Sequence, residues 1–93
     1  MNYIVLDGAA MTSREVAHTY LALKLDFPSY YGNNLDALWD ILSTVSETIH
    51  IKLVNEEKLR EHLGGYGQSL LAVLAEAAQE NEKIILSIIA EKE

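Results

Sequence analysis

Three short segments of the chain have the apolar pattern of β-strands, and they begin some 40 residues apart. The first, from Asn2 to Leu6, is β-branched and apolar and ends where Asp7 and Gly8 break it, so we expect a short buried strand. From Thr48 to Val54 apolar and polar residues alternate, which predicts a strand with one polar face. The last segment, from Ile84 to Ile89, is almost wholly apolar and is expected to be central in the sheet or covered.

Two helices are predicted between the first two strands. The first begins after a capping box in which Thr12 is followed three residues later by Glu15. It ends by about Asp26, because the residue before Pro28 avoids the helical backbone region. His18 is expected to project away from the core. The apolar residues at helical spacing form the predicted core face: Val16, Ala17, Tyr20, Leu21 and Leu23.

The second helix of this interval begins at Leu35, where Asn34 or Asn33 can accept a hydrogen bond from the free amides of the first turn. At about 3.6 residues per turn, its apolar residues fall on one stripe, which we expect to face the core. These residues are Leu35, Leu38, Ile41, Leu42 and Val45.

Two further helices are predicted between the second and third strands. Asn55 caps a short helix with an acidic start, and Gly64 ends it. The GGYG segment is expected to form a turn. A longer helix then runs from about Gln68 to Glu80, with Asn81 as a left-handed terminator.

Strands that are separated by pairs of helices indicate parallel pairing through helical crossovers, which are nearly always right-handed. The sequence therefore predicts a single α/β domain over residues 1–93 with the order β-α-α-β-α-α-β. The pattern does not determine the order of the strands in the sheet.

Composition and charge restrict the classes of function. The chain has 93 residues, of which 49% are hydrophobic, so it can form one small core. The absence of cysteine excludes disulfides, thiolate nucleophiles and thiolate-bound zinc. The net charge of −7, from 14 acidic and 7 basic residues, disfavours direct binding of nucleic acid or of an anionic membrane and favours a basic partner.

No apolar run approaches the roughly 20 residues that a membrane span needs. The first residues also lack the basic and apolar regions of a secretory signal. We therefore expect a soluble cytoplasmic protein that is monomeric when free.

The segment from Asp26 to Val45 has the composition of a recognition surface. It holds four of the seven aromatic residues, and no Lys or Arg occurs between Lys24 and Lys52. Tyrosine and tryptophan are enriched among the residues that carry binding energy at interfaces. We expect a strongly negative surface that also presents aromatic side chains.

Asp36 and Asp40 lie one turn apart on the face opposite the apolar stripe, with Ser43 beyond them and Trp39 at the boundary. They could be ordinary surface residues, with Asp36 favourably placed at the positive end of the helix dipole. They could share a divalent cation, but the further oxygen ligands that Mg²⁺ or Ca²⁺ requires are missing nearby, so no metal or other cofactor is expected. They could also take the place of substrate phosphates in a basic active site, through charge-assisted hydrogen bonds.

Catalysis by the chain itself is disfavoured. His18, His50 and His62 are the candidate acid-base groups near neutral pH, and each lies on a polar face of a different element without a catalytic partner at motif spacing. The GGYGQS segment lacks the lysine and the preceding strand of a phosphate-binding loop. We therefore predict that the protein is not an enzyme, and a small hydrolase is the weakest alternative.

The segment PSYYGNNLDALWDIL resembles the most recognisable part of the barstar family, cytoplasmic inhibitors of the secreted bacterial ribonuclease barnase. The similarity extends more weakly over nearly the whole chain and includes QSLLAVLAEAAQEN and IILSII. It implies a three-stranded parallel sheet with helical crossovers. It also implies a protein that inhibits a basic, barnase-like ribonuclease by blocking its active site.

The resemblance further implies which residues contact the partner. Asp40 matches the aspartate that barstar inserts into the phosphate site of the ribonuclease, Asp36 matches its acidic companion, and Glu76 matches a further acidic contact. Other matching contact positions are Tyr30, Asn34, Leu35, Trp39 and Ser43, and Tyr31 is included as the adjacent aromatic residue of the same loop.

The chain also departs from the family pattern. It has Thr44 and Val45 where barstar has a glycine and a tryptophan, Ile49 where barstar has a proline, and no counterpart of the two barstar cysteines. The acidic centre of the surface is kept, whereas its rim is changed. The alternative function is therefore a regulatory or immunity module of the same fold that binds a different basic toxin or protein.

Overall fold

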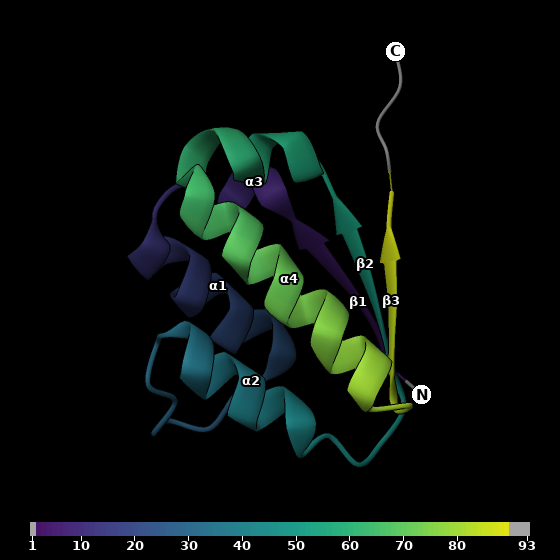
Figure 1. The fold of residues 1–93 in the computed structure, drawn as a ribbon. Coiled ribbons are helices and arrows are strands. Elements are labelled where there is room, and N and C mark those ends of the chain that lie inside the picture. Colours follow the sequence, from purple (N-terminus) through teal and green to yellow (C-terminus); the bar gives the residue numbers. More distant parts are fainter. Residues whose placement is uncertain (1, 90–93) are drawn as a thin grey trace.

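The computed structural model describes residues 2–89 and contains one sheet of three parallel strands (Figure 1). The strands are β1 (Asn2–Asp7), β2 (Ile49–Val54) and β3 (Ile84–Ile88), and their order in the sheet is β1-β2-β3. Ile51 of β2 lies opposite Ile4 of β1 and Leu86 of β3. The predicted α/β fold with parallel strands is confirmed, and β2 is the central strand.

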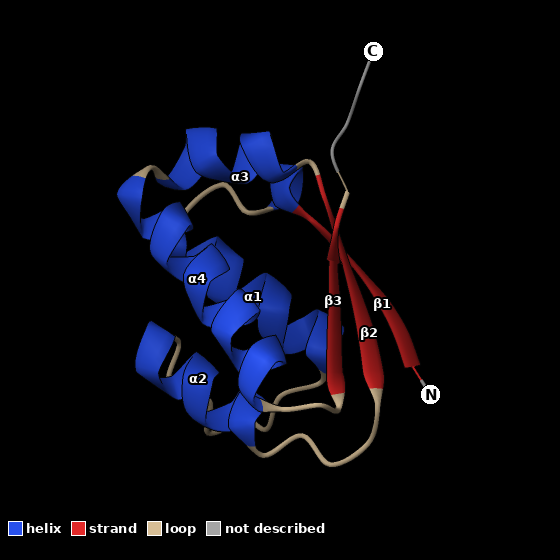
Figure 2. Ribbon diagram, turned by 45° about the vertical axis from the view of Figure 1, so that its right-hand side comes forward, coloured by secondary structure: helices blue, strands red, loops and turns tan. Residues whose placement is uncertain are grey.

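Helices connect the strands in the predicted order, with a short 3₁₀ turn added after β1. The helical elements among residues 2–89 are η1 (Gly8–Ala10), α1 (Arg14–Leu25), α2 (Leu35–Ser43), α3 (Glu56–Leu63) and α4 (Gly65–Glu80). Figure 2 shows α1, α2 and α4 together on one side of the sheet, while α3 lies near one end of the strands. The core lies between the sheet and these helices.

Among residues 2–89, no helix covers the other face of the sheet (Figure 2). Tyr3 is 75% exposed and Val5 48% exposed, whereas Leu6 is fully buried. On β3, Ile84 is buried but Ile85 is 42% exposed. The expectation that the first strand is buried and the last strand is central or covered is therefore wrong. Both are edge strands, and alternate side chains of each face solvent because helices cover only one side.

α1 packs through a face that is rotated from the predicted one and shares only part of it, since Ala17 and Leu21 are buried as expected. Ala17, His18 and Leu21 are buried, whereas Val16 is 43% exposed and Leu23 78% exposed. The prediction that His18 projects away from the core is wrong. The spacing placed the helix face incorrectly because a polar histidine was not counted among the core residues.

The ends of α1 are set by local hydrogen bonds. Ser13 is the N-cap, one residue after the predicted Thr12, and its Oγ accepts a hydrogen bond from the Val16 amide at 3.2 Å. The helix ends at Leu25, and Asp26 takes a left-handed backbone conformation with φ of 58°. The predicted end at about Asp26 is confirmed.

α4 begins at Gly65, not at Gln68, so the GGYG segment is not a simple turn. Gly64, with φ of 59°, ends α3 as predicted. Gly67 lies against α3, and a Cβ atom at this position would be 2.9 Å from Cδ2 of Leu59. Glycine therefore favours the close approach of α3 and α4, because a larger residue would push against Leu59. The junction places Tyr66 in the first turn of α4.

Two asparagines at helix ends bond to other elements. Asn55 precedes α3 without a capping side-chain bond, and its Nδ2 donates to Oδ1 of Asp7 at 2.8 Å. Asn81 is extended and not left-handed, and its Nδ2 donates to the carbonyl oxygens of Leu42 and Val45, both at 3.0 Å. The C-terminal ends of α2 and α4 are thereby joined.

Candidate partner-binding site

α2 is a capped helix with one apolar face and one acidic face. Oδ1 of Asn34 accepts a hydrogen bond from the Ala37 amide at 2.7 Å, which confirms the predicted start of the helix. Leu38 and Leu42 are fully packed into the core, as the apolar stripe predicted. The rotation of the helix is therefore fixed, and its acidic face points to solvent.

The acidic residues of α2 and α4 have no basic partner in the described part of the chain. Asp36, Asp40 and Glu76 are exposed, and their carboxylates form no ion pair or hydrogen bond within residues 2–89. The hydroxyl of Ser43 donates to the backbone oxygen of Asp40, at 2.7 Å. Since α2 and α4 lie side by side (Figure 1), the two helices present carboxylates without compensating charge.

Aromatic and apolar side chains accompany these acids. Tyr30 is 83% exposed in the loop before α2. Leu35 and Trp39 are partly buried and pack against the core with part of their surface. The structure thus places the predicted contact residues on one helix and on the loop that leads into it, with Glu76 contributed by α4.

The loop from residue 26 to residue 34 is held in place by its own backbone and by a buried aromatic side chain. Asp26 and Asn33 both have φ of 58°, a left-handed conformation that asparagine and aspartate tolerate. The Tyr31 amide donates to the Pro28 carbonyl at 3.0 Å, and the rings of Tyr31 and Phe27 have centroids 4.7 Å apart. Tyr31 is only 8% exposed, so in the free protein it anchors the loop that presents Tyr30 to solvent.

His18 connects this loop to α4. Its Nδ1 lies 2.6 Å from the hydroxyl of Tyr31 and its Nε2 lies 2.6 Å from the hydroxyl of Tyr66. The side chain is 1% exposed, and this burial lowers the pKa of the imidazole. His18 is therefore a neutral, buried group near neutral pH, and the expectation of a surface histidine is corrected.

A neutral imidazole has one N–H donor and one bare nitrogen, so one tyrosine hydroxyl donates to His18 and the other accepts from it. Protonation makes both ring nitrogens donors, and the hydroxyl that had donated must find another acceptor. Tyr31 is buried, and burial raises the pKa of its hydroxyl, so this hydroxyl stays protonated. Because the folded protein resists protonation of His18 more than the unfolded chain does, His18 contributes stability that is lost as the pH falls below its ordinary pKa, near 6.5.

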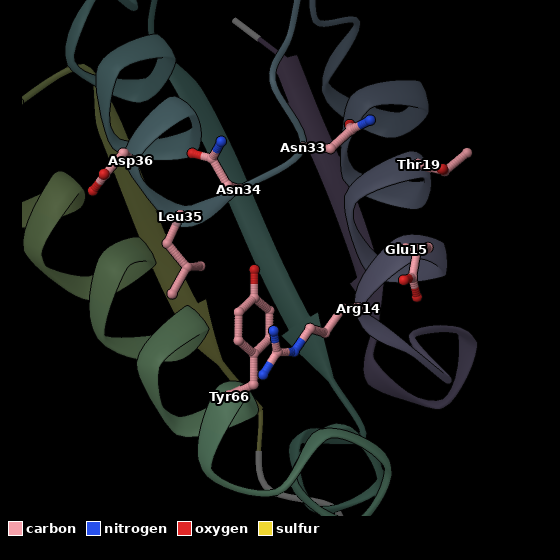
Figure 3. A pocket seen from close by; sticks show the side chains of 8 residues that line it. All are labelled: Arg14, Glu15, Thr19, Asn33, Asn34, Leu35, Asp36 and Tyr66. Atoms are coloured by element: carbon pink, nitrogen blue, oxygen red, sulfur yellow. The ribbon is translucent and has the colours of Figure 1, made fainter.

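A recess of about 480 Å³ adjoins the start of α2 (Figure 3). It contains a cation–π pair, in which the guanidinium carbon of Arg14 lies 4.4 Å from the ring centroid of Tyr66. No local sequence pattern predicts this pair, because the two residues come from the first turns of two helices that are distant in the sequence. The residues that line the recess are Arg14, Glu15, Thr19, Asn33, Asn34, Leu35, Asp36 and Tyr66.

The other histidines lie apart from this surface. The ring of His50 stacks on Tyr3 with centroids 4.6 Å apart, and His62 is exposed on α3. Within residues 2–89, no group of three or more His, Asp or Glu side chains could hold a metal ion. The described helices also include none that is long and apolar enough to cross a membrane.

Comparison with known proteins gives the family. The family model for Barstar (barnase inhibitor) matches residues 1–90. The chain is also 44% identical over 81 residues to a Bacillus subtilis (strain 168) protein named "Putative ribonuclease inhibitor YrdF", and the match covers 86% of this chain and 89% of that protein. The matched region includes all the helices and strands described above as well as the acidic surface, and the chain belongs to the barstar family.

Proposed function

We propose that this protein inhibits a basic ribonuclease by covering the active site of the enzyme with α2 and the loop before it. The carboxylates of Asp36 and Asp40 occupy the positions of substrate phosphates and accept charge-assisted hydrogen bonds from Arg, Lys or His of the enzyme. The observation that carries this proposal is a pair of exposed carboxylates on a fixed, capped helix, with no compensating base in the described structure. The inhibitor itself needs no catalytic group.

The energetics of the free helix support this assignment. A pair of like charges at positions i and i+4 destabilises a helix by about 0.2–0.5 kcal/mol. Asp36 and Asp40 form such a pair, and no basic side chain among the described residues forms an ion pair with either of them. A basic partner would turn this unfavourable pair into a favourable contact.

The surroundings of the two aspartates also suit an interface. Tyr30 and Trp39 supply aromatic surface beside the charges, and aromatic residues are enriched among the side chains that dominate binding energy. Glu76 adds a carboxylate from a second helix. The surface therefore combines charged groups with aromatic neighbours, and aromatic residues are enriched in protein interfaces.

The test is a titration of barnase with the purified protein, with hydrolysis of an RNA substrate as the readout. We expect stoichiometric loss of activity with the wild-type protein and strongly weakened inhibition with the double variant Asp36→Asn and Asp40→Asn. Glu57→Gln serves as a matched control, because it removes an exposed carboxylate from α3. Inhibition that is unaffected by the double variant would refute the assignment of the site.

Residues at the rim of the acidic surface are expected to determine which ribonucleases the protein binds. Thr44 is exposed at the end of α2 and Val45 is partly buried, and both differ from the family pattern described above. A panel of small secreted ribonucleases tested beside barnase measures this selectivity. Capture of a different basic toxin, without inhibition of any ribonuclease, would favour the alternative function of an immunity module.

We also propose that the protein acts in the cytoplasm and is monomeric before it binds. Cell fractionation tests the first point. Sedimentation of the free protein tests the second.

A further inference from the structure

We propose that Arg14 and Tyr66 form a second contact for the ribonuclease, which receives a carboxylate side chain of the enzyme in the recess beside α2. The inference rests on the proposed function, because it concerns the same partner. It adds a contact of opposite charge to the acidic surface.

Tyr66 is held in place from inside the protein. Its hydroxyl lies 2.6 Å from Nε2 of the buried His18, whose other nitrogen bonds to Tyr31 of the binding loop. The ring of Tyr66 is therefore fixed relative to the loop that leads into α2. It offers a rigid platform at the edge of the proposed interface.

Arg14 rests on this platform. The guanidinium lies 4.4 Å from the ring centroid, within the range of a cation–π interaction. A guanidinium that stacks through its face keeps its N–H donors in its own plane, so they stay free to bind a carboxylate in two parallel hydrogen bonds. Figure 3 shows the two side chains next to each other in the recess, close to Leu35.

The donors of Arg14 are not used by the acids around it. Glu15 and Asp36 line the same recess, yet neither lies within the 4.0 Å of an ion pair with Arg14 in the described part of the chain. The recess thus holds one guanidinium, that of Arg14, and two carboxylates, those of Glu15 and Asp36. A partner that fits it must present an acidic side chain next to basic ones.

Such a contact would control the orientation of the partner. The acidic surface alone attracts any basic patch of a partner. The positive charge of Arg14 at the edge of this surface instead repels basic side chains of the partner and attracts acidic ones. A ribonuclease whose carboxylate meets Arg14 is therefore held in one rotation about α2.

The experiment compares Arg14→Gln with Lys24→Gln, using barnase as the probe. Lys24 is a matched control, because it lies at the other end of α1, outside the recess, and its Nζ is 5.8 Å from the ring centroid of Tyr20. Each variant removes one positive charge from an acidic inhibitor. General attraction to a basic enzyme therefore predicts unchanged or slightly tighter binding for both variants.

The proposed contact predicts the opposite sign for Arg14 alone. We expect Arg14→Gln to shorten the lifetime of the complex about tenfold to a hundredfold, as for loss of a charge-assisted hydrogen bond, while Lys24→Gln leaves the lifetime unchanged. Arg14→Lys, which keeps the charge but loses the planar donors, should recover only part of the loss. Urea unfolding of each free variant separates an effect on binding from an effect on folding.

Replacing each acidic residue of barnase in turn by its amide identifies the carboxylate. One of these replacements should weaken binding to the wild-type inhibitor but not to Arg14→Gln. A complex with Arg14→Gln that lives as long as the wild-type complex, or the absence of any coupled acid, overturns the inference and leaves the proposed function intact. If the wild-type protein does not inhibit barnase, the proposed function fails for this enzyme and the inference fails with it.

Discussion

Replacement of Asp40 by alanine should stabilise the free protein while it removes most of the inhibition. Asp40 is exposed, lacks an ionic partner in the described residues, and lies in the last turn of α2, near the negative end of the helix dipole. The variant relieves repulsion from Asp36, worth about 0.2–0.5 kcal/mol, and an unfavourable dipole contact of at least about 0.3 kcal/mol. The higher helix propensity of alanine adds about 0.5 kcal/mol. The expected gain in the free energy of unfolding is about 1 kcal/mol.

Asp36→Ala provides the matched control, since it changes the same residue type on the same helix. Asp36 lies in the first turn, where a negative charge is favourable to the dipole. Its removal relieves the same repulsion and gains the same propensity but loses this dipole contact. With the same magnitudes, Asp36→Ala should therefore stabilise the free protein by only about 0.5 kcal/mol, clearly less than Asp40→Ala does.

Urea unfolding of the wild-type protein and both variants, without partner, at neutral pH and low salt, measures these differences. In about 1 M salt the screening length falls to about 3 Å, so the gain for Asp40→Ala should shrink to the propensity contribution. A barnase titration of the same samples records the loss of inhibition. If Asp40→Ala proves less stable than the wild type, Asp40 has an intramolecular role and the reasoning is refuted.

Three further predictions concern salt, the two acidic helices and pH. Association of the wild-type protein with barnase, followed by stopped flow, should slow as salt rises, because charge attracts the inhibitor to a basic enzyme; a rate that is independent of salt would contradict phosphate mimicry. Asp40→Ala should weaken inhibition of barnase more than Glu76→Ala, because a central, desolvated contact outweighs a charge at the rim; equal losses would show that the site is misplaced. The free energy of unfolding should fall as the pH is lowered from about 7.5 to about 5.5, since burial lowers the pKa of His18 and the unfolded chain then binds more protons. His18→Gln should flatten this dependence, and an unchanged slope would assign it to other groups.

The start and the faces of α2 could be predicted from the sequence because local signals agree there. Asn34 supplies the cap, and the apolar stripe that includes Leu38 and Leu42 has the period of a helix. The parallel sheet also followed from the spacing of the strands. Strand order could not be predicted, because it depends on where the connecting helices place each strand, in the centre or at an edge of the sheet.

The errors at α1 and α4 have a common physical cause. The sequence predicts a surface position for His18 because its burial depends on two tyrosine hydroxyls, one of them from Tyr66, 48 residues later in the sequence. The sequence also predicts a turn at Tyr66, because glycines flank it, whereas Gly67 is a helical residue that lies against α3. Polar burial and close helix contacts are tertiary features, and no local pattern contains them.

These tertiary contacts explain how an acidic surface can remain ordered. α2 is held by apolar residues beneath it and, at its C-terminal end, by the side chain of Asn81. The loop before α2 is held by Tyr31, whose hydroxyl bonds to the buried His18. Because the order of the surface comes from contacts on the inner side, the outer face is free to carry charges that destabilise the free helix. Stability and recognition thus depend on different residues of the same short segment, so removal of Asp40 can raise stability while it abolishes binding.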